Sequence, residues 1–359
     1  MKFETFPITG EAYLAGYFFA LILSLGLTLY LIKTIRGFNF FTFILNRLPA
    51  TAGKSVSPFG GISVILSFLV TLWLFIFLGL VDARNVNLFT ALTIGVGLML
   101  ILGIYDDITQ CPAKIKLSAQ IVIACILYFY GFQIDRIGNL IELGPFSILL
   151  TILWIVGITN AINLIDGMDG LASGIIFFSC LTLVFVYLER DIVEASFLAV
   201  ILAGSTLGFF FFNLPPAKII LGDTGSLPLG LLVSLITLLP LNQGHTDEIY
   251  YLIPVITLLI PIMDTTFSFF RRILKGVHPF SKDANHFHHR LKNLGLSPIK
   301  SISILFAIGF YFDLTAMVPV YRINLIPNFI PIYFIFIIIS VAILIFILHR
   351  AENKKSNDE

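Results

Sequence analysis

Long apolar runs alternate with short polar segments along the whole chain of 359 residues. A helix that crosses a membrane needs about 20 mostly apolar residues, and the alternation predicts eleven such helices. They cover residues 12–34, 58–80, 88–105, 115–133, 146–164, 170–188, 195–213, 226–242, 249–270, 299–320 and 327–348. The sequence contains no internal repeat of the kind that builds solenoid or other repeat proteins. We therefore expect one all-α integral membrane domain over residues 1–359, with a disordered polar tail at 349–359.

The composition narrows the class of protein further. Hydrophobic residues make up 58% of the chain and charged residues 12%, whereas a soluble globular protein carries about 25% charged residues. The chain therefore lacks the charged shell that a soluble enzyme or a nucleic-acid-binding domain needs, and it is too apolar to be disordered. Its three cysteines are too few for a disulfide framework.

The basic residues predict the orientation in the membrane. Eleven crossings place the two termini on opposite sides, and Lys and Arg are enriched in cytoplasmic loops. With the N-terminus outside and the C-terminus cytoplasmic, 17 of the 22 Lys and Arg residues fall on the cytoplasmic side. The segment before the first apolar run, MKFETFPITGEAY, lacks the basic stretch of a cleaved signal peptide, so we expect that run to be retained.

Polar residues that are suited to chemistry gather on the same cytoplasmic side. The third apolar run ends with Asp106 and Asp107, and Lys114 and Lys116 open the fourth. Two adjacent carboxylates repel each other unless a cation lies with them, and Mg²⁺ prefers oxygen ligands. The alternative interpretation is a solvated helix end whose lysines reach toward water.

A second polar segment, NAINLIDGMDGLASG, covers residues 160–174. Asn160, Asn163, Asp166 and Asp169 recur in it at intervals of three. This spacing places neighbours on one helix face if the helix continues, and polar groups so close to the hydrocarbon are usually functional. The alternative is an ordinary connection between two helices, with Asp and Gly as caps.

A third segment, FFNLPPAKIILGDTGSLPLG, contains Asn213, Lys218 and Asp223. Small residues at 222–226 open the eighth apolar run, and the backbone N–H groups of a helix N-terminus suit an anionic phosphate. Asp223 is placed to hold a metal that accompanies the phosphate. The GxxxxGK[ST] pattern of ATP-binding loops does not occur here. The alternative is that Asp223 only caps the helix.

The cytoplasmic loop at 271–298 carries His286, His288 and His289. No Cys or Glu lies at zinc-ligand spacing from them, and a cluster of His and Arg suits a diphosphate. We therefore favour phosphate contact over metal binding for these histidines. The arginines and lysines of the loop also fit contact with anionic lipid.

Three more charged residues lie near or within apolar runs. Lys54 precedes the glycine-containing start of the second run and is a further candidate for phosphate contact. Asp264 and Asp313 fall inside apolar runs, where an acid is a functional candidate by default. Asp264 is a candidate for lining the site, and Asp313 has no assigned role.

Taken together, these segments resemble the polyprenyl-phosphate N-acetylhexosamine-1-phosphate transferases, the glycosyltransferase 4 family. Four motifs match in order, namely Lys54 with PFGG, YDD with PAKIKLSAQ, NAINLIDGMDGLASG, and PAKIILGDTGSLPLG. The HFHH pattern of the histidine loop is similar to that of WecA and TagO proteins, and MraY proteins are more distant. The resemblance covers about residues 50–295, so we expect the catalytic part there.

The resemblance implies a reaction and its reactants. The phosphate of undecaprenyl phosphate would attack the β-phosphorus of a UDP-N-acetylhexosamine, with UDP-GlcNAc expected, and would release UMP. The site would face the cytoplasm at the bacterial inner membrane, in the first lipid-linked step of a cell-envelope glycan such as lipopolysaccharide or teichoic acid. Mg²⁺ is the implied cofactor, with Mn²⁺ as an alternative ion. No nucleic acid is expected as a partner, and a homodimer is left open.

The resemblance also implies roles for individual residues. The expected catalytic residues are Asp106, Asp107, Asp166, Asp223 and His286, of which Asp106, Asp107 and Asp223 are the expected metal ligands. The expected substrate-binding residues are Lys54, Lys116, Asn163, Asp169, Asn213, Lys218, His288 and His289. Which aspartate acts as base and which binds metal stays open.

Two alternatives remain at this stage. The first is an MraY-type transferase that uses UDP-MurNAc-pentapeptide, although Ile220 stands where MraY proteins typically carry an aromatic residue. The second is a transporter, which is expected to show inverted repeats and acids near the membrane midplane. Here no repeat occurs and the acids cluster on one side, which favours the enzyme.

Overall fold

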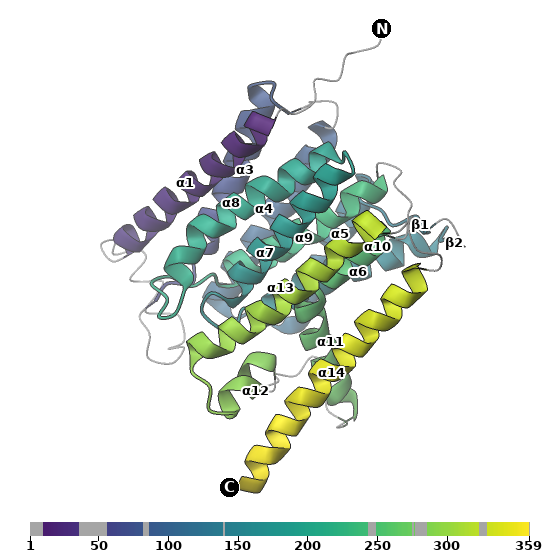
Figure 1. Ribbon diagram of the computed structural model, residues 1–359. Coiled ribbons are helices and arrows are strands. Elements are labelled where there is room, and N and C mark those ends of the chain that lie inside the picture. Colours follow the sequence, from purple (N-terminus) through teal and green to yellow (C-terminus); the bar gives the residue numbers. More distant parts are fainter. Residues whose placement is uncertain are drawn as a thin grey trace.

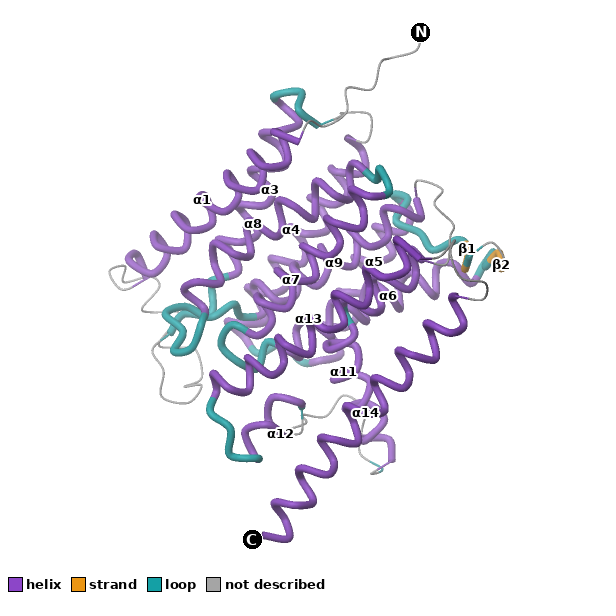
Figure 2. Tube along the Cα trace, viewed as in Figure 1, coloured by secondary structure: helices purple, strands orange, loops and turns teal. Residues whose placement is uncertain are grey.

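The computed structural model describes residues 10–35, 56–81, 86–138, 141–242, 249–274, 276, 286–322 and 329–358. Within these residues the chain forms a bundle of helices, and Figure 2 shows the connecting loops at the two ends of that bundle. One small antiparallel hairpin joins β1 (Arg136–Ile137) to β2 (Ile141–Glu142) in an exposed loop. The expected all-α class is therefore confirmed for the described part of the chain.

Each of the eleven predicted apolar segments coincides with a helix or a bent pair of helices. In chain order these are α1 (Gly10–Ile35), α3 (Gly61–Phe77), α4 (Val86–Thr109), α5 (Ala113–Phe129), α6 (Phe146–Ile165), α7 (Leu171–Glu189), α8 (Val193–Asn213), α9 (Asp223–Asn242), the pair α10 (Ile249–Thr257) and α11 (Leu259–Leu274), α13 (Pro298–Arg322) and α14 (Phe329–Asp358). A short further helix, α12 (Phe287–Asn293), lies within the histidine loop.

Several of these helices are suited to crossing a membrane. Within the described residues, seven helices are long and apolar enough, or eight when the bent pair α10–α11 is taken as one. Their outward side chains are apolar as well, as at Phe18 and Ile22 of α1 and Leu149 and Leu153 of α6. An exposed apolar surface of this kind fits lipid and not water. The protein is therefore a multi-pass membrane protein.

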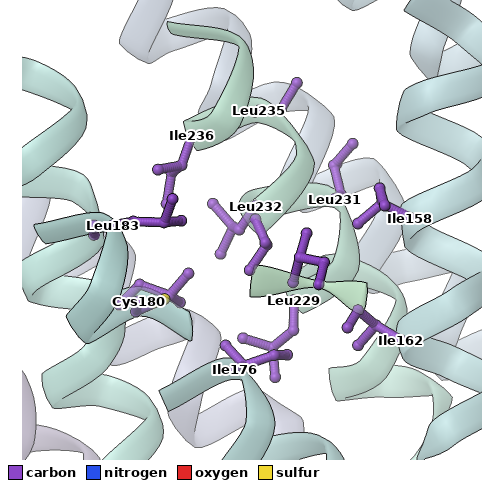
Figure 3. Close-up of a cluster of buried hydrophobic side chains, with 14 of the residues drawn as sticks. Ile158, Ile162, Ile176, Cys180, Leu183, Leu229, Leu231, Leu232, Leu235 and Ile236 are labelled. Atoms are coloured by element: carbon purple, nitrogen blue, oxygen red, sulfur yellow. The ribbon is translucent and has the colours of Figure 1, made fainter. Parts of the chain in front are cut away.

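Helix α9 forms the centre of the bundle (Figure 1). In its apolar stretch 94% of the residues are buried inside the protein, against 22% for α1. Figure 3 shows Leu229 and Leu232 of α9 between Ile162 of α6 and Cys180 of α7. Because α9 is surrounded by protein, its N-terminal end is held rigidly against its neighbours, which matters for the site that begins there.

Two glycine contacts bring α9 close to its neighbours at this end. A Cβ on Gly61, the first residue of α3, would overlap the Cα of Gly225. A Cβ on Gly103 of α4 would overlap the carbonyl group of Asp223. The backbones therefore approach more closely than any other side chain permits, and the start of α9 lies directly against α3 and α4.

The break between α10 and α11 has a local cause. Pro261 has no N–H, so the carbonyl oxygen of Thr257 lacks its helical donor four residues later. The hydroxyl of Ser179 in α7 donates a hydrogen bond to this oxygen instead, at 3.1 Å. The axes of α10 and α11 differ in direction by 73°. The bend directs α11 and its Asp264 toward the histidine loop.

One expectation about the C-terminus is wrong. The polar tail at 349–359 was expected to be disordered, but α14 continues as helix to Asp358. The segment AENKK contains Ala, Glu and Lys, which favour helix, and no Pro or Gly interrupts it. α14 lies at the edge of the bundle (Figure 1), where many of its apolar side chains are exposed.

Candidate active site

Four helix ends, from three separate parts of the sequence, meet in one polar cluster. α4 ends soon after Asp106 and Asp107, α5 begins just before Lys116, the last turn of α6 contains Asn163, and α9 begins at Asp223. α4 and α6 each pack against both α5 and α9. Three of the polar segments that the sequence singles out are therefore neighbours in space.

The Lys116 ammonium lies at the centre of this cluster. It donates to Asp106 Oδ2 at 2.7 Å, to Asp223 Oδ2 at 2.5 Å and to Asn163 Oδ1 at 3.2 Å. The side chains of Lys116, Asp106 and Asp223 are 15%, 12% and 28% exposed. Two carboxylates from separate helices thus share one cation in a largely buried position.

Asn163 completes the cluster from α6. Its amide nitrogen donates to Asp223 Oδ1 at 2.7 Å and to the hydroxyl of Ser226 at 2.8 Å. One turn earlier in α6, the amide nitrogen of Asn160 donates to Gln120 Oε1 of α5 at 2.7 Å. The two asparagines share a helix face, as their spacing predicts, but only Asn163 reaches the carboxylates.

Asp107 points to a different partner from Asp106. Its Oδ1 accepts the backbone N–H of Asp223 at 3.0 Å, and its Oδ2 accepts the backbone N–H and hydroxyl of Thr224 at 2.8 and 2.6 Å. Both oxygens therefore cap the N-terminus of α9, where the helix dipole favours a negative charge. The metal-ligand role expected for Asp107 stays a prediction, while Asp106 and Asp223 are the pair that shares a cation.

Asp166 follows the last residue of α6 and is partly buried beside the cluster. Burial raises the pKa of its carboxyl group well above the usual range. The nearby carboxylates of Asp223, Asp107 and Asp169 raise this pKa further. Among the described residues, Asp166 therefore adds negative charge next to the carboxylates that bind the Lys116 ammonium.

Asp169 and Asn213 hold two loops together. Asp169 Oδ2 accepts the backbone N–H of Ala217 at 3.1 Å. Asn213 is 1% exposed, and its Oδ1 accepts from the backbone of Gly170 and the hydroxyl of Ser173, while its Nδ2 donates to the carbonyl of Ile219. These bonds fix the loops on either side of the cluster. Direct substrate contact by either residue stays a prediction.

Lys218 lies apart from these bonds. Lys218 is exposed, and its ammonium lies 6.0 Å from the centroid of the Phe212 ring. An exposed lysine beside the loop at 214–222 is free to reach an incoming anion. Lys54 falls outside the described residues, so its predicted contact with phosphate is untested.

His286 is fixed by an acid from the bent helix. Asp264 Oδ2 lies 2.8 Å from His286 Nδ1, and Asp264 Oδ1 accepts the backbone N–H of Phe287 at 2.7 Å. The side chains of His286 and Asp264 are 7% and 3% exposed. One oxygen of the carboxylate thus orients the ring, and the other accepts a hydrogen bond from the first residue of α12.

The remaining two histidines belong to α12. His289 is partly exposed on this helix, whereas the side chain of His288 lies outside the described part of the structure. Their expected contacts with substrate stay predictions.

The structure also reveals partners that the sequence reasoning missed. Thr224 and Ser226 hold Asp107 and Asn163, and Gln120 holds Asn160. The first two belong to the GDTGS segment already singled out, and Gln120 ends the PAKIKLSAQ segment. Their hydroxyl and amide groups within apolar helices were the available signal, because buried polar groups require partners.

The cluster fits a magnesium ion by its donor chemistry. Its acceptors are the carboxylate oxygens of Asp106 and Asp223 and the amide oxygen of Asn163, and a cation already lies among them. In the described residues, no three His, Cys, Asp or Glu side chains come together as a complete metal cage. Mg²⁺ usually binds one or two carboxylates, together with waters and substrate phosphates, so two carboxylates and an amide suffice.

Comparison with known protein families shows a match over the centre of the chain. The model described as glycosyl transferase family 4 matches residues 88–240. This stretch contains the ends of α4, α5, α6 and α9 that form the cluster.

Curated relatives extend the comparison. A probable undecaprenyl-phosphate N-acetylglucosaminyl 1-phosphate transferase of Bacillus subtilis is 43% identical over 234 residues, covering 64% of this chain and 65% of that protein. A decaprenyl-phosphate N-acetylglucosaminephosphotransferase of Mycolicibacterium smegmatis is 33% identical, covering 60% and 59%. The matched region thus spans less than two thirds of the length of each of these two relatives. A phospho-N-acetylmuramoyl-pentapeptide-transferase of Prochlorococcus marinus is 30% identical over 321 residues, covering 81% and 88%.

Proposed function

Because the chain belongs to glycosyl transferase family 4, we propose that it transfers N-acetylglucosamine 1-phosphate from UDP-GlcNAc to undecaprenyl phosphate. The products are UMP and undecaprenyl diphosphate-GlcNAc. The observation that carries this proposal is the convergence of Asp106, Lys116 and Asp223 on one cation position within the family's matched stretch. The relatives named for N-acetylglucosamine transfer are more similar in sequence than the muramoyl-pentapeptide transferase, which favours the simpler sugar.

The reaction needs no external energy source. A phosphate oxygen of the lipid forms a bond to the β-phosphorus, and the bond from this phosphorus to the UMP oxygen breaks. One phosphoanhydride replaces another. The second pKa of a phosphate monoester is about 6, so the attacking phosphate is mostly dianionic at neutral pH, and no strong protein base is required.

The protein's contribution is therefore positioning and charge balance. Asp106, Asp223 and Asn163 would hold Mg²⁺, which neutralises diphosphate charge when it is bound. Lys116 and exposed Lys218 would contact phosphate oxygens. Asp107 keeps the start of α9 in place, as its three hydrogen bonds indicate.

His286 would contact the diphosphate through its second ring nitrogen. Asp264 accepts from Nδ1, so a neutral His286 carries its proton on Nδ1 and leaves Nε2 as an acceptor, while a protonated ring donates from Nε2. Donation to a phosphate oxygen is favoured when negative charge accumulates there.

The membrane arrangement follows from the same reasoning. We propose eleven crossings with the N-terminus outside and the site at the cytoplasmic face of the bacterial inner membrane. The start of α1 and the end of α14 lie at opposite ends of the bundle (Figure 1), which fits an odd number of crossings. With this orientation, 17 of the 22 basic residues lie on the cytoplasmic side, as the enrichment of Lys and Arg in cytoplasmic loops requires.

A substrate comparison tests the proposed function. Purified protein in lipid nanodiscs receives undecaprenyl phosphate, Mg²⁺ and one of UDP-GlcNAc, UDP-GalNAc or UDP-MurNAc-pentapeptide, and UMP release is measured. We expect UMP release with UDP-GlcNAc. Turnover only with UDP-MurNAc-pentapeptide would establish the MraY-type alternative, and no turnover with any of the three would reject the proposal. Omission of the lipid is the matched control.

A further inference from the structure

The ammonium of Lys116 has all three of its protons engaged by oxygen acceptors. These acceptors are Asp106 Oδ2, Asp223 Oδ2 and Asn163 Oδ1, at 2.5 to 3.2 Å from the nitrogen. An ammonium has three donors and no acceptor, so the cluster satisfies it completely. The lysine behaves here as a bound cation and not as a side chain that reaches for solvent.

The position of Lys116 on its own helix does not explain this arrangement. Lys116 lies in the first turn of α5, where the positive end of the helix dipole disfavours a cation. Lys114 lies in the same turn and is exposed. The carboxylates of Asp106 and Asp223 therefore hold Lys116 in place.

The charge balance leaves room for such a cation. Asp166 interacts with the carboxylates of both Asp223 and Asp107, and Asp223 is itself joined to Asp106 through Lys116. Among the described residues, these four carboxylates thus interact with one another around the ammonium of Lys116. A divalent ion balances this cluster better than an ammonium does, and carboxylate and amide oxygens are the ligands that Mg²⁺ prefers.

We infer that Lys116 and Mg²⁺ compete for the same oxygen atoms, and that Lys116 is an internal cation displaced when the metal binds. In the metal-free protein Lys116 neutralises the carboxylates and keeps the helix ends assembled. Metal binding releases its ammonium, which its flexible stem then carries to a phosphate of the substrate. Only this last step rests on the proposed function, since the competition itself needs no substrate.

Metal titration of variants tests the competition. The thermal unfolding midpoint of the detergent-solubilised protein is followed against MgCl₂ for the wild type, Lys116→Met and Lys114→Met. Removing the competing ammonium should lower the half-saturating Mg²⁺ concentration for Lys116→Met by about tenfold or more, given the strength of close charge interactions in partly buried sites. Lys114→Met should titrate as the wild type does. Equal or weaker Mg²⁺ binding by Lys116→Met would overturn the inference.

Amine labelling of the wild type tests the displacement and does not depend on a variant that folds. A small acylating reagent is applied briefly in EDTA or in excess Mg²⁺, without substrate, and modified Lys114 and Lys116 are quantified by fragment mass spectrometry. We expect Lys116 to react slowly in EDTA and about fivefold or more faster in Mg²⁺, because acylation requires the neutral amine and the surrounding carboxylates hold Lys116 in its charged form. Lys114 should react alike in both. Unchanged or slower labelling of Lys116 in Mg²⁺ would reject displacement.

The two proposals fail in different ways. If Mg²⁺ speeds the labelling of Lys116 but no nucleotide sugar releases UMP, the competition stands and the proposed function is wrong. If UMP is released but Mg²⁺ leaves Lys116 labelling unchanged, the function stands and the competition is wrong.

Discussion

Asp264 of α11 and His286, the residue before α12, are joined by a 2.8 Å contact between Oδ2 and Nδ1. The second oxygen of Asp264 accepts the backbone N–H of Phe287. One buried carboxylate therefore fixes both the tautomer of the ring and the start of the helix that carries the other two histidines. This relationship makes the intramembrane acid a positioning residue for the histidine loop.

Replacement of Asp264 by Asn should lower UMP release by about 10- to 100-fold, the order typical of losing a partner that orients a functional histidine. Asn has one acceptor oxygen for two donors, the Nδ1–H of His286 and the backbone N–H of Phe287. If the NH₂ group of Asn faces the ring, it donates to Nδ1, and the proton of a neutral His286 then lies on Nε2. The pH profile of UMP release should shift as the rate falls. A histidine loop that only became less rigid would lower the rate without shifting that profile. The double variant with His286→Ala should be no slower than His286→Ala alone; additive losses would count against this coupling.

Asp106 and Asp107 should respond differently to the same change. Asp107→Asn places an amide N–H against the donors of Asp223 and Thr224, so it should cost about 1 to 3 kcal/mol of stability, the range for an unsatisfied buried hydrogen-bonding group. Asp106→Asn and Asp223→Asn should abolish UMP release and leave the protein folded. Thermal unfolding and UMP assays on all three variants provide the measurement. Near-wild-type turnover of Asp223→Asn would remove it from the metal site.

The stability of the metal-free protein should depend on pH through Asp166. Burial and the surrounding carboxylates raise its pKa in the folded state, so the ionised form is penalised above that pKa, and the penalty vanishes as pH falls toward the unfolded value of about 3.9. Asp166→Asn should therefore raise the unfolding temperature in EDTA at pH 8, and the gain should shrink at pH 5. A gain that grows on acidification would contradict this reading of the cluster.

Removal of the metal should stop the reaction. Excess EDTA should abolish UMP release, and an excess of Mg²⁺ over EDTA should restore it, because Lys116 alone cannot balance both the carboxylates and a diphosphate. Mn²⁺ should substitute, since it accepts the same oxygen ligands. Persistence of turnover in EDTA would mean that the reaction proceeds without a divalent ion.

Asp313 offers a test of stability away from the cluster. Its Oδ1 is buried in α13 with no hydrogen-bond partner among the described residues, next to a small cavity that Ser179 and Thr257 also line. Such a group costs about 1 to 3 kcal/mol, and an apolar side chain of similar size removes it, so Asp313→Leu should raise the unfolding temperature. A lower unfolding temperature would show that the acid has a partner that stabilises it.

Much of the site could be predicted from the sequence, because polar and glycine residues near the hydrocarbon are rare and conspicuous. The polar segments predict Asp106, Lys116, Asn163 and Asp223 as site residues, and all four lie in the cluster. Their pairing was not predictable. The sequence suggests that the adjacent Asp106 and Asp107 share a cation, yet neighbouring residues on a helix point in directions about 100° apart, so each carboxylate meets a different helix.

The sequence by itself determined the membrane class, the positions of the helices and the polar residues that form the cluster, because apolar length and the cost of buried polar groups act locally along the chain. The tertiary structure alone decided that Asp106 pairs with Asp223 through Lys116, that Asp107 caps α9, and that Asp264 holds His286. Each of these contacts joins two segments that are separate in the sequence. Only packing brings such ends within hydrogen-bonding distance, so no local pattern encodes the partner.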